Sequence, residues 1–425
     1  MLTSIVGSNW GDEGKGRMVD LLSQEYDIII RYQGGNNAGH TVINDQGKFI
    51  LNLLPSGILR ETTVNIMGNG MVIDLAHLAG EIRKLREAGV VITPENLKIS
   101  DKAAICLPYH VQQDVLEEER LGDAKFGSTK RGIGPVYGDK YMKKVLRMGD
   151  LLEPDTLPEK VEALVNWKNL MIEKGYGSEP VKPEEILSWL REQSVYLSRF
   201  ICDVTAYLTD EIHKGKNLMF EAQLGALRDI DFGIFPYTSS SSTIAAYGPI
   251  GAGIPFAKLD KVIGIMKAYS SCVGEGPFTA EMFGEEASAL REAGGEYGAA
   301  TGRPRRVGPF DVVASRYGCM VQGADEIALT KMDVLSYMEK IPVCIAYEVD
   351  GIRTNEFLTG DRLNRAKPVI EYLDGFCQDI SGCRKMEDLP PKAMEYIRYI
   401  EKTVGCRIRY VSVGPAREDY ILMED

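Results

Sequence analysis

Short runs of β-branched and apolar residues recur along the chain and alternate with longer stretches whose apolar residues follow a helical spacing. Several of the short runs are apolar at consecutive positions, which is typical of parallel strands that are buried on both faces of a sheet. The runs that we expect to form strands cover residues 3–6, 27–32, 64–67, 218–221, 262–265, 327–330, 343–348 and 408–413.

Helical spacing predicts helices over residues 75–88, 110–121, 159–171, 183–214, 311–322 and 391–404. Asp74 and Asp311 directly precede two of these stretches and are expected to cap their N-termini, because a carboxylate can accept from the first free backbone N–H groups. Gly89, Gly215 and Gly323 stand where three of the helices would end.

The alternation of strands and helices predicts an α/β fold with a large central, mainly parallel sheet flanked by helices. We expect residues 1–425 to form a single catalytic domain, with a peripheral helical subdomain around residues 154–214. Ligands in such folds bind beyond the carboxyl ends of the strands. Long glycine-rich loops follow several of the expected strands, so we expect the site at this edge of the sheet.

The first expected strand runs into a glycine-rich loop and then into a helix, which together predict a P-loop-like phosphate loop. The standard P-loop ends in lysine followed by serine or threonine. Here Gly16 follows Lys15, and an acid, Asp12, stands inside the loop. A tight turn packed by glycines is the simpler interpretation, but a lysine and a metal-capable acid in one loop favour phosphate binding.

Composition narrows the classes of partner. The 425 residues carry a net charge of −12, which argues against general binding to nucleic acid or to anionic membranes. We find no apolar run of transmembrane length and no secretory signal, and we expect a cytoplasmic protein. The eight cysteines form no C-x-x-C pair, so reduced thiols are favoured over a zinc site.

A second glycine-rich loop, residues 34–41, follows the expected strand at 27–32 and contains Asn37 and His40. A lone histidine is more often structural than catalytic. This loop is too polar for a core position, so we favour a catalytic histidine that donates a proton or stabilises developing negative charge.

Two further motifs indicate anionic ligands. Three arginines, Arg303, Arg305 and Arg306, lie within the sequence T-G-R-P-R-R, and the arginine fork suits carboxylates and phosphates. A solvated basic loop is the alternative. The sequence from Thr330 to Asp333 reads T-K-x-D at the end of an expected strand, which resembles the guanine-reading motif of GTP-binding proteins. Beside a phosphate loop, this short match becomes moderately specific.

Taken in order, these motifs resemble those of the adenylosuccinate synthetase family, and the resemblance runs from the first strand to residue 415. The segments that carry it are residues 11–16, 37–40, 132–135, 229–233, 274–278, 301–306 and 330–333. The resemblance implies a GTP-dependent ligase that joins IMP and L-aspartate to form adenylosuccinate, GDP and phosphate through a 6-phosphoryl-IMP intermediate. This is the first committed step of AMP synthesis in purine biosynthesis. The family also implies Mg²⁺ and a homodimer.

The resemblance also implies roles for individual residues. Asp12 and His40 would be catalytic, and Asp12 and Gly39 would hold the metal. The GTP set would be Gly11, Asp12, Glu13, Gly14, Lys15, Gly16, Arg17, Arg305, Lys331, Met332, Asp333, Val413, Gly414 and Pro415. The IMP set would be Asp12, Lys15, Asn37, Ala38, Gly39, His40, Thr129, Lys143, Gln223, Thr238 and Arg303. The aspartate set would be Ala299, Ala300, Thr301, Gly302, Arg303 and Arg305.

Three positions depart from the family pattern. Lys143 stands where the family usually has an arginine that reaches the IMP of the partner subunit, and lysine lacks the bidentate fork. Gln223 lies in E-A-Q-L-G where E-G-A-Q-G is usual, which changes the register of the glutamine. Cys272 stands where an arginine is common.

Two other functions remain as alternatives. A sibling ligase would use another purine nucleotide such as dGMP, although relatives of that kind tend to lack the acid at Asp12. A GTP-binding regulatory protein would explain the T-K-x-D motif. It would not explain the separate arginine cluster or the missing hydroxyl after Lys15.

Overall fold

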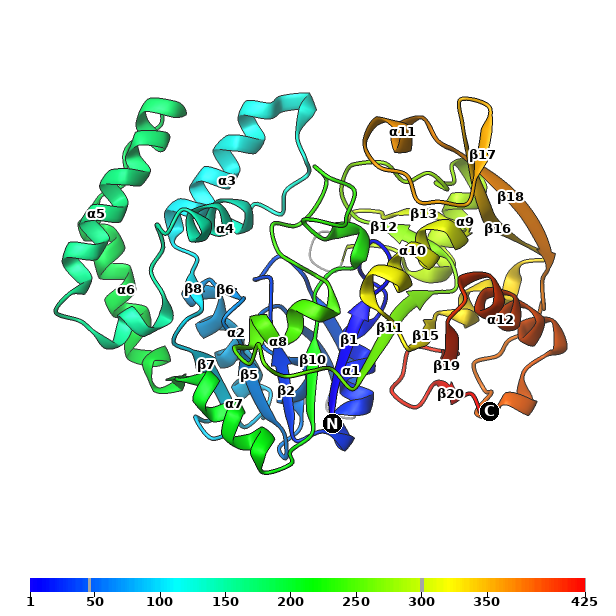
Figure 1. Cartoon of the computed structure of the whole chain (residues 1–425), viewed down its shortest axis with the longest axis horizontal. Helices are drawn as coiled ribbons and strands as arrows, with labels where there is room; N and C mark the ends of the chain where they lie inside the picture. The colour runs from blue at the N-terminus through cyan, green and yellow to red at the C-terminus, as the bar shows by residue number, and fades with distance from the viewer. Residues whose placement is uncertain (45–46, 299–301, 425) are drawn as a thin grey trace.

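A twisted ten-stranded sheet forms the centre of the molecule in the computed structural model, which describes residues 1–44, 47–298 and 302–424 (Figure 1). All neighbouring strands are parallel except the last pair, β19 and β20. In spatial order the strands are β20 (Tyr420–Leu422), β19 (Arg407–Ser412), β15 (Glu326–Thr330), β11 (Lys261–Lys267), β1 (Leu2–Gly7), β10 (Leu218–Glu221), β2 (Ile28–Arg31), β5 (Val64–Met67), β7 (Leu97–Ser100) and β9 (Ile201–Cys202). The predicted α/β fold with a mainly parallel central sheet is therefore confirmed.

The strand β1 lies in the middle of this sheet, between β10 and β11. Ile5 pairs with Glu221 on one side and with Ile263 on the other. Ile5 and Val6 are both fully buried, one from each face of the strand. The consecutive apolar residues of this strand thus reflect burial on both faces, as the sequence indicated.

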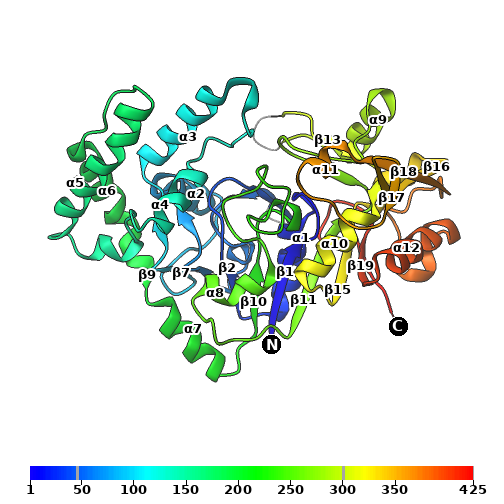
Figure 2. The same cartoon turned by 45° about the horizontal axis from the view of Figure 1, so that its top comes forward.

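Smaller sheets complete the architecture. One contains β14 (Phe310–Asp311), β16 (Lys340–Val349), β17 (Ile352–Thr354) and β18 (Lys367–Asp374), at the right of Figure 2. The others pair β3 (His40–Asn44) with β4 (Gly47–Leu51), β6 (Val72–Ile73) with β8 (Ala104–Ile105), and β12 (Ser270–Cys272) with β13 (Arg306–Gly308). The strand expected at 343–348 thus exists, but it lies outside the central sheet and pairs antiparallel with β17 and β18.

Helices cover both faces of the central sheet (Figures 1 and 2). They are α1 (Lys15–Leu22), α2 (Leu75–Glu87), α3 (Pro108–Leu121), α4 (Ile133–Tyr141), α5 (Leu157–Asn169), α6 (Pro183–Leu197), α7 (Val204–His213), α8 (Gly248–Ala252), α9 (Gly284–Gly294), α10 (Val312–Gln322), α11 (Gly360–Arg365) and α12 (Pro391–Val404). The expected caps are present, since Asp74 accepts from His77 N and Asp311 accepts from Ala314 N. In the described part of the chain, no helix is long and apolar enough to cross a membrane.

The single helix expected over 183–214 is wrong. The chain forms two helices, α6 and α7, separated by a short turn and by β9, which pairs with β7 at the edge of the sheet. The Asp203 side chain accepts from Ala206 N and starts α7. Pairing with a strand about a hundred positions earlier therefore overrides the continuous helical spacing of this segment.

Candidate active site

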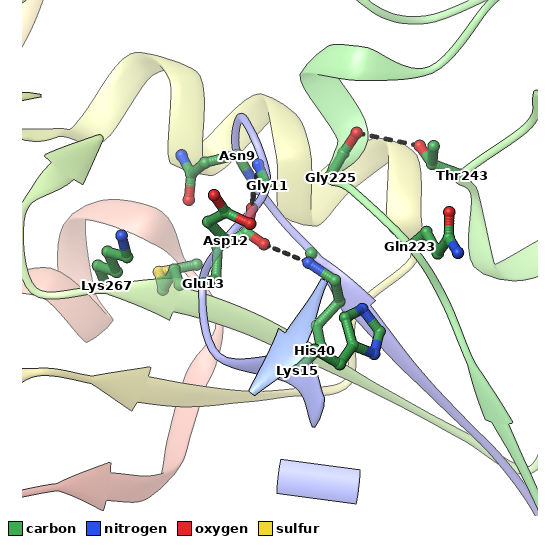
Figure 3. Close-up of polar contacts among 12 residues, drawn as sticks. Asn9, Gly11, Asp12, Glu13, Lys15, His40, Gln223, Gly225, Thr243 and Lys267 are labelled. Atoms are coloured by element: carbon green, nitrogen blue, oxygen red, sulfur yellow. Dashed lines mark hydrogen bonds and ion pairs between the residues drawn. The ribbon is translucent and has the colours of Figure 1, made fainter. Parts of the chain in front are cut away.

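The loop between β1 and α1 wraps around a buried carboxylate. Glu13 Oε1 accepts from Gly11 N at 2.8 Å and from Asn9 N at 3.2 Å, while Lys15 Nζ lies 2.5 Å from Glu13 Oε2. Glu13 and Lys15 are each only 3% exposed. Figure 3 shows Lys15 directed at this carboxylate. Asp12 adopts a left-handed backbone conformation, with φ of 58°, and its side chain remains partly accessible.

Helix α10 packs directly on the same loop. A Cβ atom at Gly318 would lie 1.7 Å from the Ser8 carbonyl oxygen, so only glycine allows this approach. Asn9 Nδ2 donates to Ser315 Oγ at 3.0 Å, and Gln322 Nε2 donates to the Gly7 carbonyl at 2.9 Å. The phosphate loop is therefore held from outside as well as by Glu13.

The absence of a hydroxyl after Lys15 has a steric cause. A Cβ atom at Gly16 would lie 2.6 Å from His40 Cβ and 3.3 Å from Ser56 Oγ. Real Cβ atoms do not approach so closely, because the repulsion rises steeply inside van der Waals contact. His40 therefore occupies the space that the serine or threonine of a standard P-loop would need.

His40 begins β3 and is held by a buried acid. Its Nδ1 lies 2.5 Å from Glu221 Oε1, and Glu221 also accepts from Ser56 N at 2.7 Å and from Ser56 Oγ at 2.5 Å. Burial raises the pKa of Glu221, but its interactions with His40, Arg31 and Ser56 together outweigh burial and lower it overall. An ionised Glu221 accepts from Nδ1–H, which leaves Nε2 of the neutral ring as an acceptor. Burial lowers the pKa of His40 despite Glu221.

The T-K-x-D segment lies beside the phosphate loop. Thr330 Oγ1 donates to the Glu13 carbonyl at 2.7 Å, which ties the end of β15 to the loop. Lys331 follows in a left-handed conformation, and burial raises the pKa of Asp333. The structure thus brings the two motifs together, as their shared position at strand ends predicted.

Arg17 connects the loop to the far end of the sequence. Its guanidinium donates to Ser412 Oγ and to the carbonyls of Gly414, Ala416 and Asp419. Four acceptors from one segment show that Arg17 shapes the turn after β19 rather than pointing at open space. Val413, Gly414 and Pro415 lie within this turn.

Arg305 joins the arginine cluster to the phosphate loop. Its Nη2 lies 3.0 Å from Asp12 Oδ2, and its Nη1 lies 2.9 Å from Glu296 Oε2. Arg303 is exposed and lies 3.5 Å from Glu275. The expected aspartate residues Ala299, Ala300 and Thr301 lie outside the described residues.

Gln223 faces the second glycine loop. Its Nε2 donates to the Gly35 carbonyl at 2.7 Å, and a Cβ atom at Gly34 would lie 2.2 Å from its Oε1. The next residue, Leu224, is left-handed with φ of 59°. The glutamine stands one position earlier in its motif than is usual in the family, but its side-chain amide still contacts the loop of residues 34–41. Gln223 Oε1 is buried and makes no hydrogen bond within the described part of the chain.

Other expected IMP residues lie farther out. Asn37 Oδ1 accepts from Gly35 N, and Ala38 and exposed Gly39 continue this loop. Thr238 is partly buried, whereas Thr129 and Lys143 are exposed, on the segment before α4 and on the turn that follows it.

The cysteine that departs from the family pattern has a neighbouring arginine. Cys272 Sγ accepts from Arg228 Nη2 at 3.0 Å, and Arg228 also donates to the carbonyls of Val273 and Glu275. Arginine at position 272 would place a second guanidinium against Arg228. The positive charge in this region thus comes from another segment of the chain.

Sequence reasoning missed the acids that hold the site together. The sequence motifs include Glu221 only as the residue two positions before Gln223, and they assign no role to Glu296. Among the described residues, no group of three or more His, Cys, Asp and Glu side chains could hold a metal alone. Asp12 carboxylate and Gly39 carbonyl oxygens are nevertheless hard donors, which suits an ion that also binds phosphate oxygens and water.

Comparison with known proteins gives a consistent result. The family model described as adenylosuccinate synthetase matches residues 4–421. Adenylosuccinate synthetases of Streptococcus gordonii and Streptococcus sanguinis are 43% and 42% identical to the chain over 421 residues, which is 99% of this chain and 97% of each relative. The structure of fully ligated adenylosuccinate synthetase from Plasmodium falciparum matches with a TM-score of 0.93 and 34% identity over 99% of both chains. Cyanophage S-2L succinoaminodeoxyadenylate synthetase shares the fold, with a TM-score of 0.63 and 18% identity over 100% of this chain and 95% of that chain.

Proposed function

The chain belongs to the adenylosuccinate synthetase family, and we propose how its own residues carry out the reaction of that family. The enzyme joins IMP and L-aspartate with the use of GTP to form adenylosuccinate. The observation that carries our assignment of residues is the position of Asp12, which lies inside the phosphate loop and is paired with Arg305. A carboxylate there serves a proton transfer or a metal better than it serves simple phosphate binding.

Asp12 acts as the general base. It removes the N1 proton of IMP, and the electron density released onto O6 allows that oxygen to attack the γ-phosphorus of GTP. GDP leaves, and the product is 6-phosphoryl-IMP. The amine of L-aspartate then attacks C6, phosphate leaves and adenylosuccinate forms. The accessible side chain of Asp12 supports this role, because the base must reach a bound purine ring.

His40 donates a hydrogen bond to the phosphoryl group as charge builds on the leaving GDP. The neutral ring cannot do this from Nε2, because Nδ1–H is directed to Glu221. We therefore propose that bound phosphates, with their negative charge, raise the pKa of His40 and that the ring takes up a proton on binding. Glu221 supports the imidazolium that results.

Magnesium fits the oxygen donors at this site. We propose that Asp12 and the Gly39 carbonyl would hold Mg²⁺, which would supply charge neutralisation at the phosphates of GTP. Lys15, already next to the loop, adds a fixed positive charge close to the phosphates.

The substrate sets follow the family pattern. We propose that GTP binds residues 11–17, Arg305, residues 331–333 and residues 413–415, with Arg17 acting through the turn that it holds. IMP binds Asp12, Lys15, residues 37–40, Thr129, Lys143, Gln223, Thr238 and Arg303. L-Aspartate binds residues 299–303 and Arg305. The contact of the Gln223 amide with Gly35, in the same loop as residues 37–40, supports the IMP set.

We propose a homodimer in which Lys143 reaches the IMP of the partner subunit. The adjacent large apolar side chains of Tyr141 and Met142 are 78% and 50% exposed. Such exposure is expected of a surface that a second subunit covers. We also propose one catalytic domain, with the helices around residues 154–214 as a peripheral subdomain, and a cytoplasmic location.

Phosphate release by the purified protein tests the proposal. GTP, Mg²⁺, IMP and L-aspartate are supplied together, each is then omitted in turn, and adenylosuccinate is identified in the product. Release that needs all three substrates supports the proposal. Release without IMP or aspartate would indicate a GTPase, and release that begins only when dGMP replaces IMP would indicate the sibling ligase.

A further inference from the structure

A buried carboxylate just beyond the C-terminus of α9 forms ion pairs with three cationic side chains. Glu296 is fully buried. Its Oε1 accepts from Lys267 Nζ at 2.7 Å and from Tyr269 OH at 2.5 Å, and its Oε2 accepts from Arg305 Nη1 at 2.9 Å. Lys331 Nζ lies 3.4 Å from Oε1. Burial alone would raise the pKa of Glu296, but the three cations, with Lys267 the strongest, hold it far below its usual range.

The three cations come from three different parts of the site. Lys267 ends β11, the strand that neighbours β1 in the sheet (Figure 3). Lys331 follows β15 in the T-K-x-D motif, and its Nζ also donates to the Gly294 carbonyl. Arg305 belongs to the arginine cluster. One carboxylate thus connects the guanine-reading segment with the arginine of the aspartate loop.

Glu296 also closes the base of that loop through its backbone. Arg305 N donates to the Glu296 carbonyl at 2.9 Å, and Gly298 N donates to the Arg303 carbonyl at 2.8 Å. The side chain and the main chain of Glu296 therefore hold the same arginine. The second amino group of Arg305, Nη2, contacts Asp12. The orientation of this guanidinium therefore also affects the general base.

We propose that Glu296 is a positioning residue that sets Arg305 for L-aspartate and Lys331 for the guanine of GTP through one shared charge. This inference rests on the proposed function. Without the carboxylate, buried Lys267 would lose its counter-charge and would repel the charges of Arg305 and Lys331, and an uncompensated buried charge is strongly unfavourable. Arg305 and Lys331 would then move apart, and both substrates would lose their contacts together.

The isosteric variant Glu296→Gln tests the proposal. Glutamine keeps the shape and one acceptor, but it is neutral and its amide NH₂ would face cations. We expect the KM values for L-aspartate and GTP to rise together by about tenfold or more, as expected for the loss of charge-assisted hydrogen bonds. The KM for IMP should rise less than either of these, because Glu296 reaches the IMP residue Asp12 only indirectly, through Arg305.

Two variants serve as controls. Tyr269→Phe removes the uncharged donor from the same oxygen and leaves the three cations paired, so it should cost stability without raising either KM. Glu286→Gln removes an exposed carboxylate on the adjacent α9 and should behave as the wild type. Thermal unfolding of every variant is measured beside the kinetics, which separates a loss of stability from a loss of positioning.

Each outcome has a definite meaning. Raised KM values for L-aspartate and GTP in Glu296→Gln, with neither raised in Tyr269→Phe, support the proposal. Unchanged KM values, a fall in kcat alone, or the same rise in Tyr269→Phe overturn it. If Glu296→Gln does not fold, Glu296→Asp retains the charge at a shorter reach, and the same joint rise, smaller in size, is required. A wild-type enzyme that needs neither IMP nor aspartate would instead refute the proposed function.

Discussion

Replacing Asp311 with asparagine should make the protein more stable at neutral pH and less dependent on pH. Asp311 caps α10, is fully buried, and accepts from Ala314 N at 2.9 Å and from Tyr347 OH at 2.7 Å. Burial raises its pKa to about 6, against an ordinary value of about 4. An amide oxygen can accept the capping hydrogen bond equally well, and the amide NH₂ can donate to the Tyr347 hydroxyl oxygen, so Asp311→Asn removes the charge and keeps both contacts.

The size of the effect follows from linkage. The folded state binds the proton more tightly than the unfolded state, so the stabilising contribution of protonated Asp311 is complete below about pH 4. It is lost as the pH rises through about 6. A pKa difference of about two units corresponds to about 3 kcal/mol between these limits. For a chain of 425 residues this corresponds to roughly 3 °C in melting temperature.

Differential scanning calorimetry between pH 5 and pH 8 would measure the effect. We expect the melting temperature of Asp311→Asn to exceed that of the wild type at pH 7–8 and the advantage to shrink toward pH 5. Asp74→Asn is the matched control, because Asp74 caps α2 but is only half-buried. An advantage of the same size at pH 5 and pH 8 would refute the assignment of this pH dependence to Asp311.

Three further outcomes test the site. Asp12→Asn should reduce turnover by at least about a hundredfold and leave GTP binding measurable by fluorescence titration; near-normal turnover would exclude Asp12 as the base. Gly16→Ser should lower kcat by about tenfold or more, because its Cβ would meet His40 Cβ at 2.6 Å, and a variant with normal kcat would show that His40 can move without loss. Calorimetric titration with IMP and GTP near pH 7.5, in buffers of different ionisation enthalpy, should show proton uptake that His40→Asn abolishes. The lowered pKa of His40 leaves the ring neutral in the free protein, and the phosphate charge raises that pKa in the complex. Proton uptake is therefore expected only at pH values between the pKa of the free protein and that of the complex. Uptake that persists in His40→Asn would assign the proton to another group.

Local signals in the sequence predicted much of the fold. The strand–loop–helix at the N-terminus, the caps at Asp74 and Asp311, and the helix stop at Gly323 depend on a few adjacent residues, and all are present. The segment from 183 to 214 was predicted wrongly because its break is imposed by β7, which lies far away in the sequence. Propensity within a window contains no information about such a partner.

The chemistry of the site was predictable only in part. The G-D-E-G-K-G and T-K-x-D motifs are contiguous, so Lys15 and Lys331 could be proposed as site residues from their neighbours alone. Glu221 and Glu296 act through residues that are 181 and 29 positions away, at His40 and Lys267, and isolated glutamates carry no spacing signal. The steric reason for Gly16 likewise depends on His40, which only the folded chain brings into contact.

The central place of β1 determines when the strand that leads into the phosphate loop can be paired during synthesis of the chain. Its two neighbours, β10 and β11, are synthesised only after residue 217, so the strand that leads into the phosphate loop has no partner during the first half of translation. The turn held by Arg17 arrives later still, with residues 412–419. Contacts between such distant segments form slowly, so the arrangement around the phosphate loop is expected to be completed late in folding. A polypeptide that ends before these residues therefore lacks both the strands and the turn that hold this loop in the folded chain.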